Sequence, residues 1–257
     1  MATRLQTWFR SLGRSACAAG LIGGAALASL LSGTPAALAI PEADAIKKLQ
    51  VVPVFVLTDG KGMPLPVPRD KNLVLPLYLE SAKANQQLAM LQKSNPELKA
   101  QVLAVPLNVM NAKVAELNQQ LKDKTKPLVA PIIINEGDRQ QAVALLKAQG
   151  LTEQQINEGL NVPVFFTKPF LTVTTPEGPR GVFYLSYETL QNSLAKLPPG
   201  DRDKLKPQVA DLTAVLREII KAKDDSYIFF PTPEYFRLVQ QNQNQGGAAA
   251  GSGSGKP

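Results

Sequence analysis

The chain has 257 residues, a net charge of +7 and no histidine. The lack of imidazole excludes Ser-His-Asp and Cys-His catalysis, and it excludes zinc, copper and iron sites that need histidine ligands. The single cysteine, Cys17, lies in a segment that we expect to be removed, so the mature chain has no thiol chemistry and no disulfide. The G-x-G-x-x-G, G-x-x-x-x-G-K-[ST] and G-x-S-x-G motifs are also missing. We therefore predict neither an enzyme nor a cofactor.

Residues 1–39 have the pattern of a cleaved secretory leader. They carry three arginines and no acid, then an apolar run of small residues over 16–31, then Ala37-Leu38-Ala39 as a cleavage site. A transmembrane anchor is the alternative, but three glycines interrupt the run. We expect export by the general secretory route to the periplasm or the thylakoid lumen. No membrane span is expected once the leader is removed.

The remaining 218 residues carry a net charge of +4, because the leader takes three arginines and no carboxylate with it. This charge is spread over many lysines and glutamates, without a basic stripe that contains aromatic residues. We predict no nucleic-acid partner. A chain of this length can bury a core as one domain or as two small ones.

The first half opens with a helix and a hairpin. Pro41 and two early acids begin a short helix, and Asp59-Gly60-Lys61-Gly62 supplies a tight turn between the apolar runs of a β-hairpin over 51–68. Alternating strands and helices follow, each recognised by its apolar spacing and by its capping or stop residues. They are a strand at 73–79, a helix at 81–95, a strand at 101–105, a helix at 108–121, a strand at 128–134 and a helix at 135–149.

The second half repeats this order. Val162-Pro163-Val164-Phe165 repeats Val52-Pro53-Val54-Phe55 at an offset of 110 residues. A helix at 152–159 precedes it, as the first helix precedes the first hairpin. The other elements are strands at 162–166, 170–174 and 181–185, a helix at 186–197, a strand at 207–212, a helix at 212–220, a strand at 226–230 and a helix at 232–241.

These elements predict an α/β fold of two pseudo-symmetric halves. Each half is a β-hairpin followed by strand-helix units in a mixed sheet. The predicted boundaries are 1–39 for the leader, 40–150 for the first repeat, 151–241 for the second repeat and 242–257 for a disordered tail rich in Gly, Ala, Gln and Ser.

Carboxylates are the remaining catalytic candidates. Each occupies a position where a turn, a cap or a helix surface would place it, and no pair has visibly contrasting environments. We therefore assign them structural roles and keep an envelope enzyme as a third hypothesis. The carboxylates considered are Asp59, Glu80, Glu136, Asp138, Glu188 and Asp211.

Apolar side chains are the candidates for binding. Most large ones should be core, but methionine and phenylalanine at a hairpin edge are suited to binding extended chains without sequence preference. We predict that such a groove is lined by Met63, Leu65, Phe166 and Phe170.

Several segments together resemble one known family. They are VVPVFVLTDGKGMPL from Val51, LPLYLESAKANQQLAML from Leu75, VLAVPLNVM from Val102, NVPVFFTKPFLTV from Asn161 and GVFYLSYETLQNSL from Gly181. The family is the twenty-two-kilodalton subunit of the translocon at the inner envelope of chloroplasts (Tic), in its cyanobacterial branch. The resemblance covers Ile40 to Gln241, and VPVF-x-L-T-D-x-x-G-x-P-L is its most specific part.

The resemblance implies a soluble, two-lobed α/β protein with apolar grooves flanking a pseudo-symmetric core and a chaperone-like role as an escort. Because an exported protein has no ATP supply and the chain has no nucleotide-binding motif, we expect it to act without ATP. Its partners would be unfolded or extended polypeptide clients and the outer-membrane barrel-assembly protein. A non-catalytic adaptor that docks on an outer-membrane assembly machine is the alternative. The family has no catalytic motif to transfer, so the groove residues rest on the apolar pattern alone.

Overall fold

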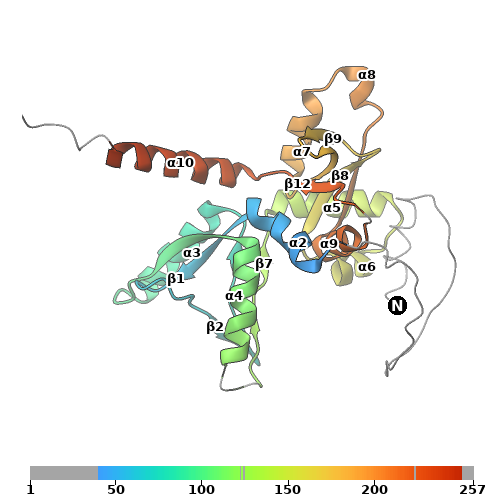
Figure 1. The fold of residues 1–257 in the computed structure, drawn as a ribbon. Helices are drawn as coiled ribbons and strands as arrows, with labels where there is room; N and C mark the ends of the chain where they lie inside the picture. The colour runs from blue at the N-terminus through green and yellow to red at the C-terminus, as the bar shows by residue number, and fades with distance from the viewer. Residues whose placement is uncertain (1–39, 122, 124, 223, 251–257) are drawn as a thin grey trace, which may run out of the picture.

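A computed structural model describes residues 40–121, 123, 125–222 and 224–250. The predicted leader lies outside these residues. The first and second halves form two lobes, with α2 and α9 between them and α10 running back beside the first lobe (Figure 1). The fold is mixed α/β, as the sequence predicted.

The first half begins with α2 (Glu42–Lys47) and a 3₁₀ turn, η2 (Lys48–Val51). Its helices α3, α4 and α5 each follow a strand, in keeping with the predicted strand-helix units. The further elements are β1 (Pro53–Thr58), β2 (Val67–Arg69), β3 (Asn72–Val74), β4 (Leu77–Tyr78), α3 (Ser81–Ser94), β5 (Gln101–Pro106), α4 (Leu107–Gln120), β6 (Leu128–Val129), β7 (Ile132–Ile133) and α5 (Glu136–Ala148).

The second half begins at α6 (Glu153–Gly159), where Thr152 and Gln155 form the predicted capping box. Its strands and helices follow in the same order. They are β8 (Pro163–Lys168), β9 (Thr172–Thr175), β10 (Gly178–Phe183), α7 (Tyr187–Ala195), α8 (Pro199–Arg202), β11 (Lys206–Asp211), α9 (Leu212–Lys221), β12 (Tyr227–Phe229) and α10 (Pro233–Ala250).

The strands form one four-stranded sheet, β5-β1-β4-β7, and three smaller groups, β12-β10-β9, β11-β8 and β2-β3-β6. Two predicted strands, 73–79 and 128–134, are each divided by a proline, Pro76 and Pro131. They still run side by side in parallel, because β3 pairs with β6 and β4 pairs with β7. These paired segments join the four-stranded sheet to the group β2-β3-β6.

Equivalent strands in the two halves pair in the same register. Phe55 lies opposite Tyr78, and Phe165 lies opposite Tyr184. The Leu107 N–H donates to the Val52 carbonyl, as the Leu212 N–H does to the Val162 carbonyl. This shared register is what an internal duplication would produce, and the boundaries at 40–150 and 151–241 stay a prediction.

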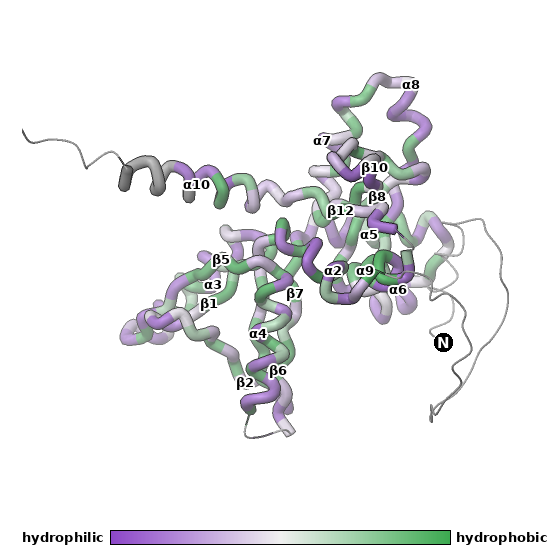
Figure 2. The backbone as a smooth tube through the Cα atoms, in the orientation of Figure 1, coloured by the Kyte–Doolittle hydropathy of each residue, from purple (hydrophilic) through white to green (hydrophobic). Residues whose placement is uncertain are grey.

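Successive side chains along β1 and β8 point to opposite faces of the strand, so they belong to different hydrophobic clusters. Val54, Val56, Val164 and Phe166 belong to a central cluster that draws residues from both halves. Helix α9 contributes Val215 and Ile219 to it, and Figure 2 shows this helix as a hydrophobic segment.

The outer face of each sheet is covered in part by a helix from the other half. Phe55 packs with Ala84 of α3 and with Leu238 of α10, the last helix of the second half. Phe165 packs in a cluster with Leu190 of α7 and Leu146 of α5, the last helix of the first half. The halves therefore exchange their terminal helices.

The predicted hairpin over 51–68 was only partly right. Its turn forms, and the Asp59 carboxylate accepts from the Lys61 and Met63 N–H groups at 2.8 and 2.9 Å. The return arm pairs with β1 only through the Thr58–Pro64 bridge and a hydrogen bond from Leu65 to Leu57. Prolines at alternate positions of this arm cannot donate to a ladder, so β1 pairs along its length with β5 instead.

The predicted tail boundary was wrong for residues 242–250, which continue α10 to Ala250. Glutamine and alanine favour helix, and this preference outweighs the cost of about 1 kcal/mol for each of Gly246 and Gly247. The rest of the predicted tail, 251–257, lies outside the described residues.

Candidate functional site

The structure separates the four predicted groove residues. Met63 is 51% exposed and Leu65 is half-buried, and both lie in the loop after β1. Phe166 is 1% exposed, and Phe170 is half-buried against the central core. Phe166 is therefore a core residue, and its assignment to an open groove was wrong.

Phe166 and Phe170 belong to an aromatic cluster inside the second half. Their rings stack with centroids 5.3 Å apart, and Phe183 meets both rings edge-on at 5.6 and 5.5 Å. Gly181 makes this packing possible, since a Cβ there would lie 3.0 Å from Tyr227 and 3.2 Å from Phe170. The cluster stabilises the fold and offers no space to a client.

Exposed large apolar side chains occur mainly in the first half. Among the described residues, all but one of them belong to this half, and the exception is Phe236 in α10. We call this set the apolar surface of the first half. Its members are Met63, Val67, Met90, Leu103, Val109 and Val129.

Part of this surface is a row of valines across the sheet β2-β3-β6. Val67 lies opposite Val74, and Val74 lies beside Val129. The neighbouring row, Leu73 and Leu128, turns toward the central core. Because successive side chains alternate between faces, the three valines share the face that points away from the core.

A cavity of about 640 Å³ lies where the first turns of α3, α5, α7 and α10 meet. Both halves contribute to its wall. Four of its lining residues are acidic, namely Glu80, Asp138, Glu188 and Glu234. Sequence reasoning named the first three but did not predict that they meet.

Two of these carboxylates hold helix ends in the opposite half. Asp138 of α5 accepts a 2.7 Å hydrogen bond from the Tyr187 N–H at the start of α7. Glu234 of α10 is buried, and it accepts from the Ser81 N–H at 3.2 Å and from the Ser81 hydroxyl at 3.1 Å. The N-terminal end of a helix favours such acceptors. The two contacts occupy equivalent positions in the two halves, and each holds a terminal helix against the opposite half.

Sequence reasoning did not name Glu234 as a candidate, although its position in the chain is informative. Asp138 and Glu234 each stand in the first turn of the helix that ends their half. Sequence reasoning gave Asp138 only a structural role and did not single out Glu234. The Arg237 guanidinium lies 3.0 Å from Glu234, so that carboxylate has a cationic partner as well.

Burial raises the pKa of Asp138 above its ordinary value, and the charges of Glu80 and Glu188 raise that pKa further. The Tyr187 N–H and the Lys83 ammonium act in the opposite direction. The folded protein therefore holds this proton more tightly than the unfolded chain does. It follows that the contribution of Asp138 to stability falls as the pH rises through its raised pKa.

We expect Asp138→Asn to remove this pH dependence while keeping an oxygen that accepts from Tyr187. Relative to this variant, the wild-type protein should gain stability as the pH falls through the raised pKa of Asp138 toward the ordinary value of an aspartate. Urea unfolding of both proteins across that pH range measures the difference. Asp138→Ala, which also loses the acceptor, should be about 1 kcal/mol less stable than Asp138→Asn at every pH. A parallel pH profile for wild type and Asp138→Asn would contradict the assignment.

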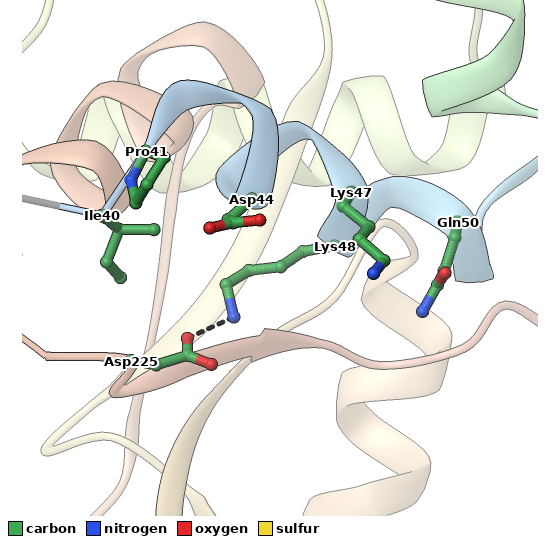
Figure 3. Close-up of a pocket in the computed structure, with 7 residues that line it drawn as sticks. All are labelled: Ile40, Pro41, Asp44, Lys47, Lys48, Gln50 and Asp225. Carbon is green, nitrogen blue, oxygen red and sulfur yellow. Dashed lines mark hydrogen bonds and ion pairs between the residues drawn. The ribbon is translucent and has the colours of Figure 1, made fainter.

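A second contact between the halves lies beside α2. The Lys48 ammonium, on a side chain 13% exposed, donates to the carboxylate of Asp225, and Arg180 approaches the same carboxylate at 3.9 Å. Figure 3 shows Lys48 reaching from η2 across a cavity of about 380 Å³ toward Asp225, while Lys47 and Gln50 point elsewhere. This ion pair joins the start of the first half to the loop before β12.

No group of three or more His, Cys, Asp or Glu side chains that could hold a metal ion occurs in 40–121, 125–222 and the other described positions. The carboxylates of the cavity accept hydrogen bonds from helix ends, as described above. Their geometry supports a structural role.

A model of the Tic22-like family matches residues 11–241. The chain belongs to the Tic22-like family. Among solved structures, Anabaena Tic22 is similar in fold, with a TM-score of 0.63, 22% identity, and coverage of 79% of this chain and 97% of that one. Tic22 from Plasmodium falciparum gives a TM-score of 0.60 and 16% identity, with 78% and 98% covered. No curated protein matches the chain.

Within the described part of this Tic22-like chain, no helix is both long and apolar enough to cross a membrane. The exposed apolar residues are spread over strands, a loop and helices.

Proposed function

We propose that this protein acts in protein transport by holding unfolded or extended polypeptides without ATP and without catalysis. The observation that carries the proposal is the apolar surface of the first half, which stays exposed while the aromatic cluster of the second half is closed. Anabaena Tic22, which shares the fold, is a protein-transport protein. Exposed apolar patches on a folded chain are typical of interaction sites.

The surface suits weak and reversible binding. Burying one valine, leucine or methionine side chain fully contributes about 1.5–3 kcal/mol, and ordering a flexible client opposes this gain. These side chains are already about half buried, so a client that covers two or three of them would bind in roughly the millimolar range or more weakly. Such affinity allows a client to be passed on without an energy source.

The test is suppression of aggregation of a chemically unfolded model client. The variant Met63→Ser, Val67→Ser, Val129→Ser should lose at least half of the suppression, because it removes exposed apolar area without opening the core. Phe236→Ser is the matched control, since this exposed side chain lies outside the first half. Full suppression by the triple variant would overturn the apolar surface as the client site.

For the cellular setting, we propose an exported protein in the periplasm or the thylakoid lumen that works beside the outer-membrane barrel-assembly protein. The arginine-containing, acid-free leader with its A-x-A site supports export. Co-purification from envelope fractions tests the partnership. If the barrel-assembly protein were recovered while unfolded chains failed to bind, the adaptor role would replace the escort role.

A further inference from the structure

Two sheet edges in the described part of the fold, those of β2 and β11, are protected against pairing with another chain. The outer edge of β2 carries Pro66 and Pro68, which have no N–H to donate. On β11, Pro207 lacks a donor, and the Gln208 side-chain amide donates to the Pro207 carbonyl at 2.8 Å. Both edges therefore offer few main-chain groups to a partner.

The outer edge of β5 is different, and its register shows which groups are free. The Leu107 N–H donates to the Val52 carbonyl, so Val105 and Leu103 also face β1 with their main-chain groups. Because the pattern alternates in an antiparallel pair, the N–H and carbonyl groups of Val102 and Ala104 point away from β1. The described residues place no strand on that side of β5.

The composition of β5 lacks the usual protection. Gln101–Pro106 contains no charged residue, and its proline stands at the last position, next to the start of α4. Natural edge strands are commonly blocked by lysine, proline, a bulge or short length. β5 has six residues and none of these features along its interior.

Side chains on both faces of β5 suit an added strand. On one face, Leu103 is 41% exposed and lies opposite Val56. On the other face lies a cavity of about 310 Å³ whose apolar side is formed by Val102, Ala104, Phe55 and Leu238. Its polar side is formed by Ser81, Asn85, Glu234, Arg237 and Gln241. Alternate residues of an added strand would meet apolar contacts on each face.

We propose that the free edge of β5 captures an extended, uncharged polypeptide segment as an additional strand. Main-chain hydrogen bonds would hold the segment whatever its sequence, while Leu103 and the cavity favour apolar side chains at alternate positions. The inference rests on the proposed function, because the captured segment belongs to a client. It adds the conformation and the position in which the client binds.

The first experiment follows amide hydrogen exchange of the full chain by NMR. The probe is a short peptide of alternating valine and threonine with a lysine at each end. In the free protein, the Val102 and Ala104 amides should exchange quickly, and the Leu103 and Val105 amides should exchange slowly. A saturating amount of peptide should slow exchange at Val102 and Ala104 at least tenfold and leave Leu103 and Val105 unchanged.

Main-chain bonding is tested with the same peptide carrying an N-methyl group on every backbone nitrogen. This peptide keeps the side chains and should bind at least tenfold more weakly. On the protein, Ala104→Pro removes one free donor, and Ala104→Ser is its matched control because it keeps the N–H. Binding should fall for the proline variant alone. If that variant fails to fold, the N-methylated peptide still decides the question.

The two proposals fail differently. If the peptide binds and aggregation is suppressed while exchange at Val102 and Ala104 is unchanged, the edge of β5 is not the site and the escort function stands. If neither peptide nor unfolded client binds, both proposals are overturned.

Discussion

Replacing Phe166 with serine should destabilise the protein by about 3–5 kcal/mol, the cost typical of truncating a buried phenylalanine. Phe166 is 1% exposed and is in ring contact with Phe170 and Phe183. Serine would leave a cavity and place a hydroxyl in apolar surroundings. Urea unfolding followed by circular dichroism measures the loss.

Met63→Ser is the matched control, because Met63 is half exposed and its replacement should change stability by no more than about 0.5 kcal/mol. The pair separates a core role from a binding role. If Phe166→Ser unfolded at nearly the wild-type urea concentration and yet lost client binding, Phe166 would belong to an open groove after all.

Replacing Asp211 with alanine should cost roughly 2–4 kcal/mol, because three backbone N–H groups would lose their acceptor at a buried position. The Asp211 carboxylate accepts from Asn161 at 2.8 Å, from Val162 at 3.0 Å and from Thr213 at 2.9 Å. One side chain thus caps α9 and fixes the entry into β8. Thermal and urea unfolding measure the effect.

Asp211→Asn is the conservative control for this position. It keeps one acceptor oxygen and loses the other, so its cost should be intermediate. Equal stability of Asp211→Ala and the wild-type protein would mean that water replaces the carboxylate at these N–H groups. The structural role that the sequence suggested for Asp211 would then be wrong.

The order of elements could be predicted because it depends on local chemistry. Apolar spacing, the capping box at Thr152 and Gln155, and the turn at Asp59 all act over a few residues. The proline pattern of 64–68 also contained the information that the return arm could not extend a ladder. It was interpreted as the second arm of a β-hairpin rather than as the end of pairing.

Pairing partners could not be predicted in the same way. β1 selects β5, far along the chain, because that segment has a continuous set of donors and the hairpin arm does not. Likewise, the exposure of Phe166 could not be judged from its strand alone, since it depends on Phe170 and Phe183 folding over it. The cavity carboxylates meet only because the terminal helices cross between halves.

Because α5 and α10 cross between the halves, each half is completed by a helix from the other half. A growing polypeptide emerges with its N-terminus first, so the outer side of Phe55 stays only partly covered until nearly the last residues, including Leu238, have been made. Until then only one helix of this cluster, α3, covers Phe55 through Ala84, so the first lobe stays incomplete for almost the whole of synthesis. A chain that stops before residue 233 would lack the helix that closes its opening strand, however well the rest of it had formed.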